Sequence, residues 1–231
     1  MQLSATDCAV VCTDALPRVL LTGFDAFGGA SINPSWLAVK ALDGEILAGH
    51  MVVAAQLPTE FDASPKELVR LLVQHKPRLV LCVGQAGGRN AISIERIAIN
   101  ITDAIIADNA GDQPVDVPVV ASGPDAYFST LPIKAILQGL QREGLPAEVS
   151  QTAGTFVCNH VFYALMHTLA KKRGFKRTRG GFVHVPYLAE QGSPNMPLAD
   201  IVRGLRVAIE SALTLRKVPS ILPIIAAGKI S

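Results

Sequence analysis

Short runs of hydrophobic residues alternate along this chain with amphipathic stretches. Most runs are continuously apolar, which is typical of strands buried on both faces. The run at residues 91–101 instead alternates apolar and polar side chains, which predicts a strand with one more polar face. The predicted strands cover Arg18–Phe24, His50–Leu57 and residues 79–84, 91–101, 147–151 and 180–188.

The amphipathic stretches have apolar residues at helical spacing and helix-starting residues near their N-terminal ends. In one of them, Ser64, Pro65 and Glu67 predict an N-cap, a first-turn proline and a capping box. In another, the helical pattern starts at Val161, just after Cys158. The predicted helices cover residues 34–42, 64–78, 131–144, 161–169 and 197–213.

Strands separated by helices predict an α/β fold with helices on both faces of the sheet. We find no internal repeat and no linker-like composition that would divide the chain. We therefore predict a single catalytic α/β domain at residues 18–231, preceded by a loosely ordered extension at residues 1–17.

Composition narrows the classes of function. Of the 231 residues, 49% are hydrophobic and 17% are charged, so the chain can bury a substantial core. The formal net charge of +2 argues against a nucleic-acid or membrane-surface partner. No apolar run is long enough to cross a bilayer.

Four cysteines are present, namely Cys8, Cys12, Cys82 and Cys158. The N-terminus lacks the basic region of a secretory signal, and the chain lacks a cysteine-dense framework, so we expect reduced thiols and a cytoplasmic location. Cys8 and Cys12 form a CxxxC pair without a matching His or Cys pair. We therefore expect no metal site and no cofactor.

Cys158 is the first candidate for chemistry, because its thiol is predicted at or near a helix N-terminus. Unpaired N–H groups and the helix dipole there favour a thiolate and could receive an oxyanion. Taken alone, however, a free cysteine is more often a small buried hydrophobic residue.

Two polar residues inside apolar strands could be its partners. His184 interrupts residues 180–188, and Glu95 interrupts residues 91–101. Such residues are costly to bury without partners, although each could also be satisfied by ordinary structural contacts. A Glu that orients a His for a nucleophilic Cys would explain all three placements. His160 is only two residues from Cys158 and would face another direction on a helix.

Four blocks, LLTGFDAFGGASINPSW, VGQAGGRNAISIERIAIN, GTFVCNHVFYALMH and GGFVHVPY, together resemble the pyroglutamyl peptidase I (pyrrolidone-carboxylate peptidase) family. The resemblance implies a three-layer α/β/α sandwich with a mixed, mostly parallel sheet, usually assembled as a homotetramer. It implies a cysteine peptidase that removes N-terminal pyroglutamate from peptides through a thioester acyl-enzyme.

On this chain the family's catalytic triad falls on Cys158 as the nucleophile, His184 as the general base and acid, and Glu95 as the orienting residue. The implied pocket for the lactam ring falls on Phe24 and Phe27 of the first loop, Gln85 of the second, and backbone groups near Phe156 and Val157.

The chain departs from the family pattern at Ile105, where an arginine is expected, and at Ala26, where proline is common. Two alternatives stay open, and the change at Ile105 would mark the altered substrate choice of the first. One is a cysteine amidase with a different substrate on the same scaffold, and the other is a binding protein that keeps the pocket without turnover.

Overall fold

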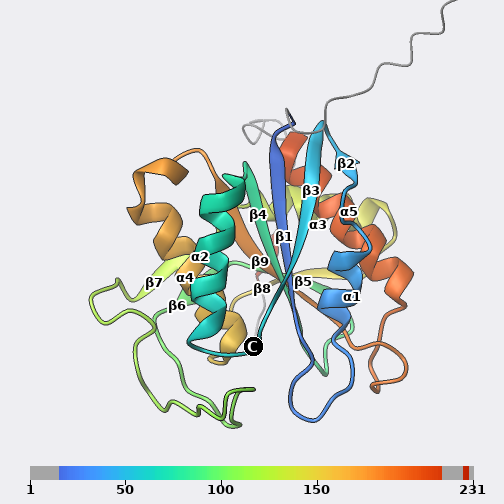
Figure 1. The fold of residues 1–231 in the computed structure, drawn as a ribbon. Helices are drawn as coiled ribbons and strands as arrows, with labels where there is room; N and C mark the ends of the chain where they lie inside the picture. Colours follow the sequence, from blue (N-terminus) through green and yellow to red (C-terminus); the bar gives the residue numbers. More distant parts are fainter. Residues whose placement is uncertain (1–15, 215–225, 229–231) are drawn as a thin grey trace, which may run out of the picture.

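The structure, a computed structural model, describes residues 16–214 and 226–228. Figure 1 shows a twisted sheet between two layers of helices. The strands are β1 Arg18–Phe24, β2 Ile46–Leu47, β3 His50–Leu57, β4 Leu79–Gln85, β5 Ile92–Glu95, β6 Ile97–Ile99, β7 Ala126–Phe128, β8 Ala147–Ser150 and β9 Arg179–Val185. The helices are α1 Pro34–Lys40, α2 Ala63–His75, α3 Ile133–Arg142, α4 Val157–Lys171 and α5 Leu198–Thr214, with a 3-10 turn η2 at Arg173–Phe175.

The main sheet has seven strands in the order β2-β3-β1-β4-β9-β5-β8. Strands β3, β1, β4 and β9 are parallel, β2 is antiparallel to β3, and β5 is antiparallel to β9 and parallel to β8. The predicted α/β class with a mixed, mostly parallel sheet is therefore confirmed.

Each face of the sheet has its own hydrophobic cluster. One cluster joins the sheet to α1, α3 and α5, and the other joins it to α2 and α4. Figure 1 shows the same division of the helices between the two faces. The continuous apolar pattern of β1, β4 and β9 follows from this arrangement, because side chains on both faces of these strands are buried.

The predicted strand at residues 91–101 is divided in two at Arg96. The backbone N–H of Arg96 donates to Ser150 and its carbonyl accepts from Ser129. After this point the chain leaves the main sheet, and β6 pairs with β7 in a separate two-stranded sheet. The alternating pattern runs through both strands and so gave no sign of the change.

The predicted start of the second helix is wrong in detail. Helix α2 begins at Ala63, and its N-cap residue Asp62 makes no side-chain cap bond. The Ser64 hydroxyl donates to the carbonyl of Pro58 instead, and Glu67 pairs with Arg70. The loop before the helix therefore takes the Ser64 hydroxyl, and a residue of the helix itself takes the Glu67 carboxylate.

Most of the predicted extension, including Cys8 and Cys12, lies outside the described residues. Among the helices that the structure describes, none combines the length and hydropathy needed to cross a membrane.

Candidate active site

Cys158 is the second residue of α4, which confirms its predicted place at a helix start. The helix brings the thiol against the backbone of β4. A Cβ atom added at Gly84 would lie 2.8 Å from the Cys158 Sγ and equally close to the Phe182 ring. Gly84 is therefore required by close approach, since any side chain there would displace the thiol.

His184 lies beside this point because β9 pairs with β4 in parallel, with Gly84 opposite His184. Paired residues of neighbouring strands project to the same face of a sheet. The imidazole therefore projects toward the face that α4 covers, where the thiol lies. The ring is almost fully buried and contacts Phe182 at a centroid distance of 4.9 Å.

Glu95 reaches His184 because β5 runs antiparallel to β9, with Ser93 opposite His184. The Glu95 side chain is 0% exposed, and its Oε1 lies 2.7 Å from His184 Nδ1. A carboxylate accepts hydrogen bonds, so Nδ1 carries the proton. This leaves Nε2 without a hydrogen as the basic nitrogen of the neutral ring.

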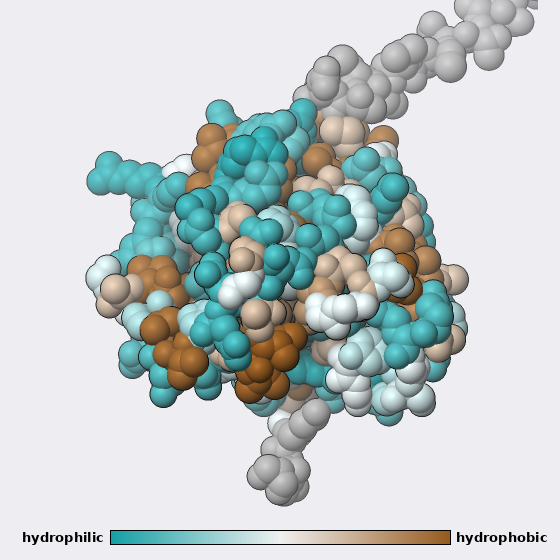
Figure 2. Space-filling view, turned by 60° about the horizontal axis from the view of Figure 1, so that its bottom comes forward, coloured by the Kyte–Doolittle hydropathy of each residue, from teal (hydrophilic) through white to brown (hydrophobic). Residues whose placement is uncertain are grey.

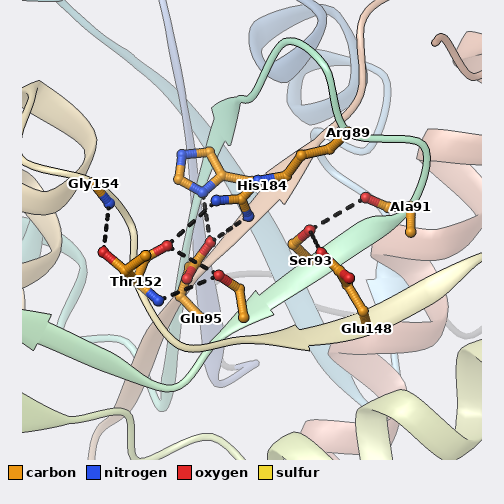
Figure 3. A network of polar contacts seen from close by, with 9 residues as sticks. Arg89, Ala91, Ser93, Glu95, Glu148, Thr152, Gly154 and His184 are labelled. Carbon is orange, nitrogen blue, oxygen red and sulfur yellow. Dashed lines mark hydrogen bonds and ion pairs between the residues drawn. The ribbon is translucent and has the colours of Figure 1, made fainter. Parts of the chain in front are cut away.

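Arg89 completes the polar cluster, and sequence reasoning missed it. It lies in the glycine-rich loop between β4 and β5, and its Nη1 donates to Glu95 Oε1 at 2.8 Å. Its Nη2 lies 3.3 Å from the carbonyl of Thr152, in the loop that leads to α4. Figure 3 shows the guanidinium and the imidazole meeting at the Glu95 carboxylate. The sequence did offer a signal for Arg89, because it lies six residues before Glu95, a carboxylate in an apolar strand.

The environment of Cys158 favours the neutral thiol, whereas the helix N-terminus alone was expected to favour a thiolate. Burial raises the pKa of the Cys158 thiol to about 12, and the charge of Glu95 adds to the increase. Arg89 and a backbone hydrogen bond lower this pKa, but by less. The resting thiol is therefore neutral at pH 7, and its proton has to leave during the reaction.

An open cleft of about 540 Å³ lies at the end of β4, where Gln85 follows Gly84, and none of Cys158, His184, Glu95 and Arg89 is among its lining residues. Phe27, Gln85 and Ile106 are among its lining residues, and the Phe27 ring packs against Phe156 at 5.8 Å between centroids. Gln85 Oε1 accepts a 2.9 Å hydrogen bond from Gln191, which fixes the Gln85 amide at the wall of the cleft.

The other two predicted pocket residues are in the core. The Phe24 side chain is 2% exposed and packs against Phe182, and Val157 is fully buried. Neither is among the lining residues of the cleft, so a direct role for Phe24 in binding stays a prediction. The backbone of Val157 remains at the N-terminus of α4, where no side chain caps the N–H groups.

Comparisons with known proteins agree with this arrangement. The family described as Pyroglutamyl peptidase matches residues 17–215. The chain is 57% identical over 203 residues to pyrrolidone-carboxylate peptidase 1 of Ralstonia nicotianae, covering 86% of this chain and 94% of that protein. It is 54% identical over 207 residues to pyrrolidone-carboxylate peptidase of Bacillus cytotoxicus, covering 87% and 95%.

The chain belongs to the pyroglutamyl peptidase family. Solved structures agree with the membership. Pyroglutamyl peptidase I of Bacillus amyloliquefaciens superimposes with a TM-score of 0.83 at 46% identity, covering 86% of this chain and 97% of that one. A mutant pyrrolidone carboxyl peptidase of Pyrococcus furiosus gives 0.82 at 42% identity, covering 85% and 98%.

Two neighbours of Cys158 on α4 have structural roles in this family member. Asn159, which sequence reasoning missed, is fully buried; it accepts from the N–H of Ile99 and donates to the carbonyls of Ile99 and Ile101. His160 Nδ1 lies 2.9 Å from the Thr102 hydroxyl, and burial lowers the pKa of His160 to about 4. Asn159 therefore anchors the start of the helix, and His160 stays neutral at pH 7.

The family departure at Ile105 lies on the surface. Its side chain is 93% exposed, whereas its neighbour Ile106 is less exposed and lines the cleft. In Figure 2 the bottom of the Figure 1 view comes forward, and brown hydrophobic areas lie among the polar surface. Other exposed hydrophobic residues of the same long loop are Ile101, Val115 and Val117.

Within the described residues, no group of three His, Cys, Asp or Glu side chains is arranged to hold a metal ion. Cys82 and Cys158 are both free thiols. The chemistry available at the cluster is therefore that of a thiol, an imidazole and a carboxylate paired with a guanidinium.

Proposed function

We propose that this family member removes N-terminal pyroglutamate from peptides, with Cys158 as the nucleophile, His184 as the general base and acid, and Glu95 as the orienting residue. The observation that carries the proposal is the 2.7 Å hydrogen bond from His184 Nδ1 to Glu95, beside a thiol that lies over Gly84. Three chain segments thus supply the nucleophile, base and orienting group that covalent amide hydrolysis needs.

In the first step His184 Nε2 takes the thiol proton as Cys158 Sγ attacks the carbonyl carbon of the pyroglutamyl residue. The uncapped N–H groups at the start of α4 hold the oxyanion. The imidazolium then gives its proton to the leaving amine as the C–N bond breaks, and a thioester remains. Water, activated by His184, attacks the thioester and releases 5-oxoproline and the free thiol.

The raised pKa of Cys158 fits this sequence of events. A thiol with a pKa of about 12 is not ionised at rest, so the base has to remove its proton during attack. The Glu95 carboxylate stabilises the imidazolium that forms, because it lies 2.7 Å from Nδ1.

The cleft suits a flat, uncharged ring. The Phe27 and Phe156 rings offer apolar surface, and Gln85 has its amide oxygen occupied by Gln191. The Gln85 amide nitrogen has no partner among the described residues and can donate to the lactam carbonyl. Among the described residues that line the cleft, Glu190 is the one acidic side chain.

The decisive experiment compares a pyroglutamyl fluorogenic amide with the matching prolyl amide. We expect the wild type to cleave the pyroglutamyl amide selectively and Cys158→Ala to be inactive. Cleavage of other N-terminal residues in preference to pyroglutamate would favour an amidase of different specificity. Binding of 5-oxoproline without turnover would favour a binding protein. Assembly as a homotetramer and a cytoplasmic location stay predictions.

A further inference from the structure

Arg89 has contacts that the proposed chemistry does not yet use. Its guanidinium and the His184 ring both bind Oε1 of Glu95, at 2.8 and 2.7 Å. The second carboxylate oxygen, Oε2, is buried and has no hydrogen-bond partner among the described residues. One oxygen of a fully buried carboxylate thus receives both available donors, and this fixes the side-chain rotation of Glu95 toward His184.

The position of Arg89 is itself constrained. Its loop turns at Gly88, which has a φ of +79°, and the backbone of Gly87 lies against the Tyr187 ring with no room for a Cβ. From there the side chain, 27% exposed, reaches Glu95 in β5 and the Thr152 carbonyl before α4. Arg89 therefore links the strand that holds the orienting carboxylate to the loop that leads to the thiol.

The charges at the site point to a second consequence. When His184 takes the proton of Cys158, the site holds a thiolate and an imidazolium beside the Glu95 carboxylate. Without Arg89 these three groups would sum to one negative charge in a mostly buried site. With Arg89 the four groups sum to zero both before and after the proton moves, because the transfer itself changes no net charge. Arg89 therefore offsets the buried charge of Glu95, which otherwise opposes ionisation of the Cys158 thiol.

We propose that Arg89 is a positioning residue that holds the Glu95 carboxylate on His184 and offsets the buried negative charge of Glu95, which opposes ionisation of the Cys158 thiol. This inference rests on the proposed roles of Cys158, His184 and Glu95. It adds that thiol ionisation depends on a residue outside the triad. Arg89 acts through Glu95 and through its charge and does not touch the substrate.

The test measures the thiol directly, by the rate at which iodoacetamide alkylates Cys158 as a function of pH, followed by peptide mass spectrometry. In Arg89→Met we expect the profile to move to higher pH by about one unit, with a rate at pH 7 that is about tenfold lower. Arg89→Lys keeps the charge and should restore most of the rate. The matched control is Arg206→Met, which removes an arginine paired with Glu45 at 2.7 Å on the other face of the sheet. This control should leave the profile unchanged.

Steady-state kinetics on the pyroglutamyl amide provide a second readout. We expect kcat of Arg89→Met to fall about tenfold or more with KM within about twofold, because binding in the cleft does not involve Arg89. An unshifted alkylation profile in Arg89→Met would overturn the inference, even if thermal stability fell. If Arg89→Met does not fold, Arg89→Gln is the neutral variant to measure, and an unshifted profile there has the same force.

The two proposals can fail separately. A wild type that does not cleave the pyroglutamyl amide but shows Arg89-dependent alkylation refutes the proposed substrate alone. A wild type that cleaves the amide, with alkylation independent of Arg89, refutes only the role of Arg89.

Discussion

Cys82 and Cys158 are both thiols on the same side of the sheet, but only Cys158 has charged partners beside it. Burial raises the pKa of both thiols to about 12. Cys82 is in the middle of β4, fully buried in the apolar cluster under α2 and α4. Cys158 starts a helix and has Glu95 and Arg89 among the charges that act on it. A thiol becomes a candidate nucleophile through its polar partners, not through its resting pKa.

The largest expected effect comes from removing each thiol in turn. Cys158→Ala should lower turnover of a pyroglutamyl amide by about 10³-fold or more, because the covalent step is lost. Cys82→Ala should keep turnover and cost about 1 kcal/mol of unfolding free energy through the small cavity it leaves. Amide hydrolysis and chemical denaturation measure the two effects. Equal losses of activity in both variants would contradict the distinction.

The next effect tests the close approach of Cys158 to the sheet. Gly84→Ala places a methyl group 2.8 Å from the resting position of Sγ, so we expect about a 10²-fold loss of kcat. Gly174→Ala is the matched control, because a Cβ there meets nothing within 4 Å. The kinetics of both variants decide the matter, and a fully active Gly84→Ala would show that the thiol does not work from this position.

His160 tests whether a histidine near the thiol in sequence takes part in the chemistry. Burial lowers the pKa of His160 to about 4, from an ordinary value of 6.5. The unfolded chain binds this proton more readily, so His160 contributes stability above pH 6.5 that is lost as the pH falls toward 4. Between pH 7 and pH 4.5 we expect the wild type to lose about 2 kcal/mol more unfolding free energy than His160→Gln.

Urea denaturation at the two pH values provides this measurement. At pH 7, His160→Gln should still turn over the amide, whereas His184→Gln should not. A loss of thiol alkylation in His160→Gln would place His160 in the chemistry after all.

The smallest effect is expected at Ile105. Its side chain is 93% exposed, so Ile105→Arg should change unfolding free energy by less than about 0.5 kcal/mol. We expect kcat/KM to change by less than about threefold. Ile106→Arg, which places a charge in the cleft lining, is the contrasting variant and should raise KM clearly. A large gain of activity in Ile105→Arg would show that the exposed position contacts the substrate.

The sequence by itself determined the five helices that the structure describes, six of the seven strands of the main sheet, and the unusual polar residues Glu95 and His184, but not β2 or β7. These features are local, because periodicity and helix-starting residues act within a few positions along the chain. The residues of β1 and β3 were predicted with the bounds that the structure has.

Only the tertiary structure decided which of these residues meet. Glu95 reaches His184 because β5 runs antiparallel in an otherwise mostly parallel sheet, and no pattern within β5 encodes the direction of its neighbour. Arg89 was missed although it lies only six residues before Glu95, because their pairing depends on the turn of the loop that leads into β5. Asn159 was missed because its partners are backbone groups of Ile99 and Ile101, in another segment. Pairings of this kind depend on strand register and packing between distant segments, which a single sequence does not fix.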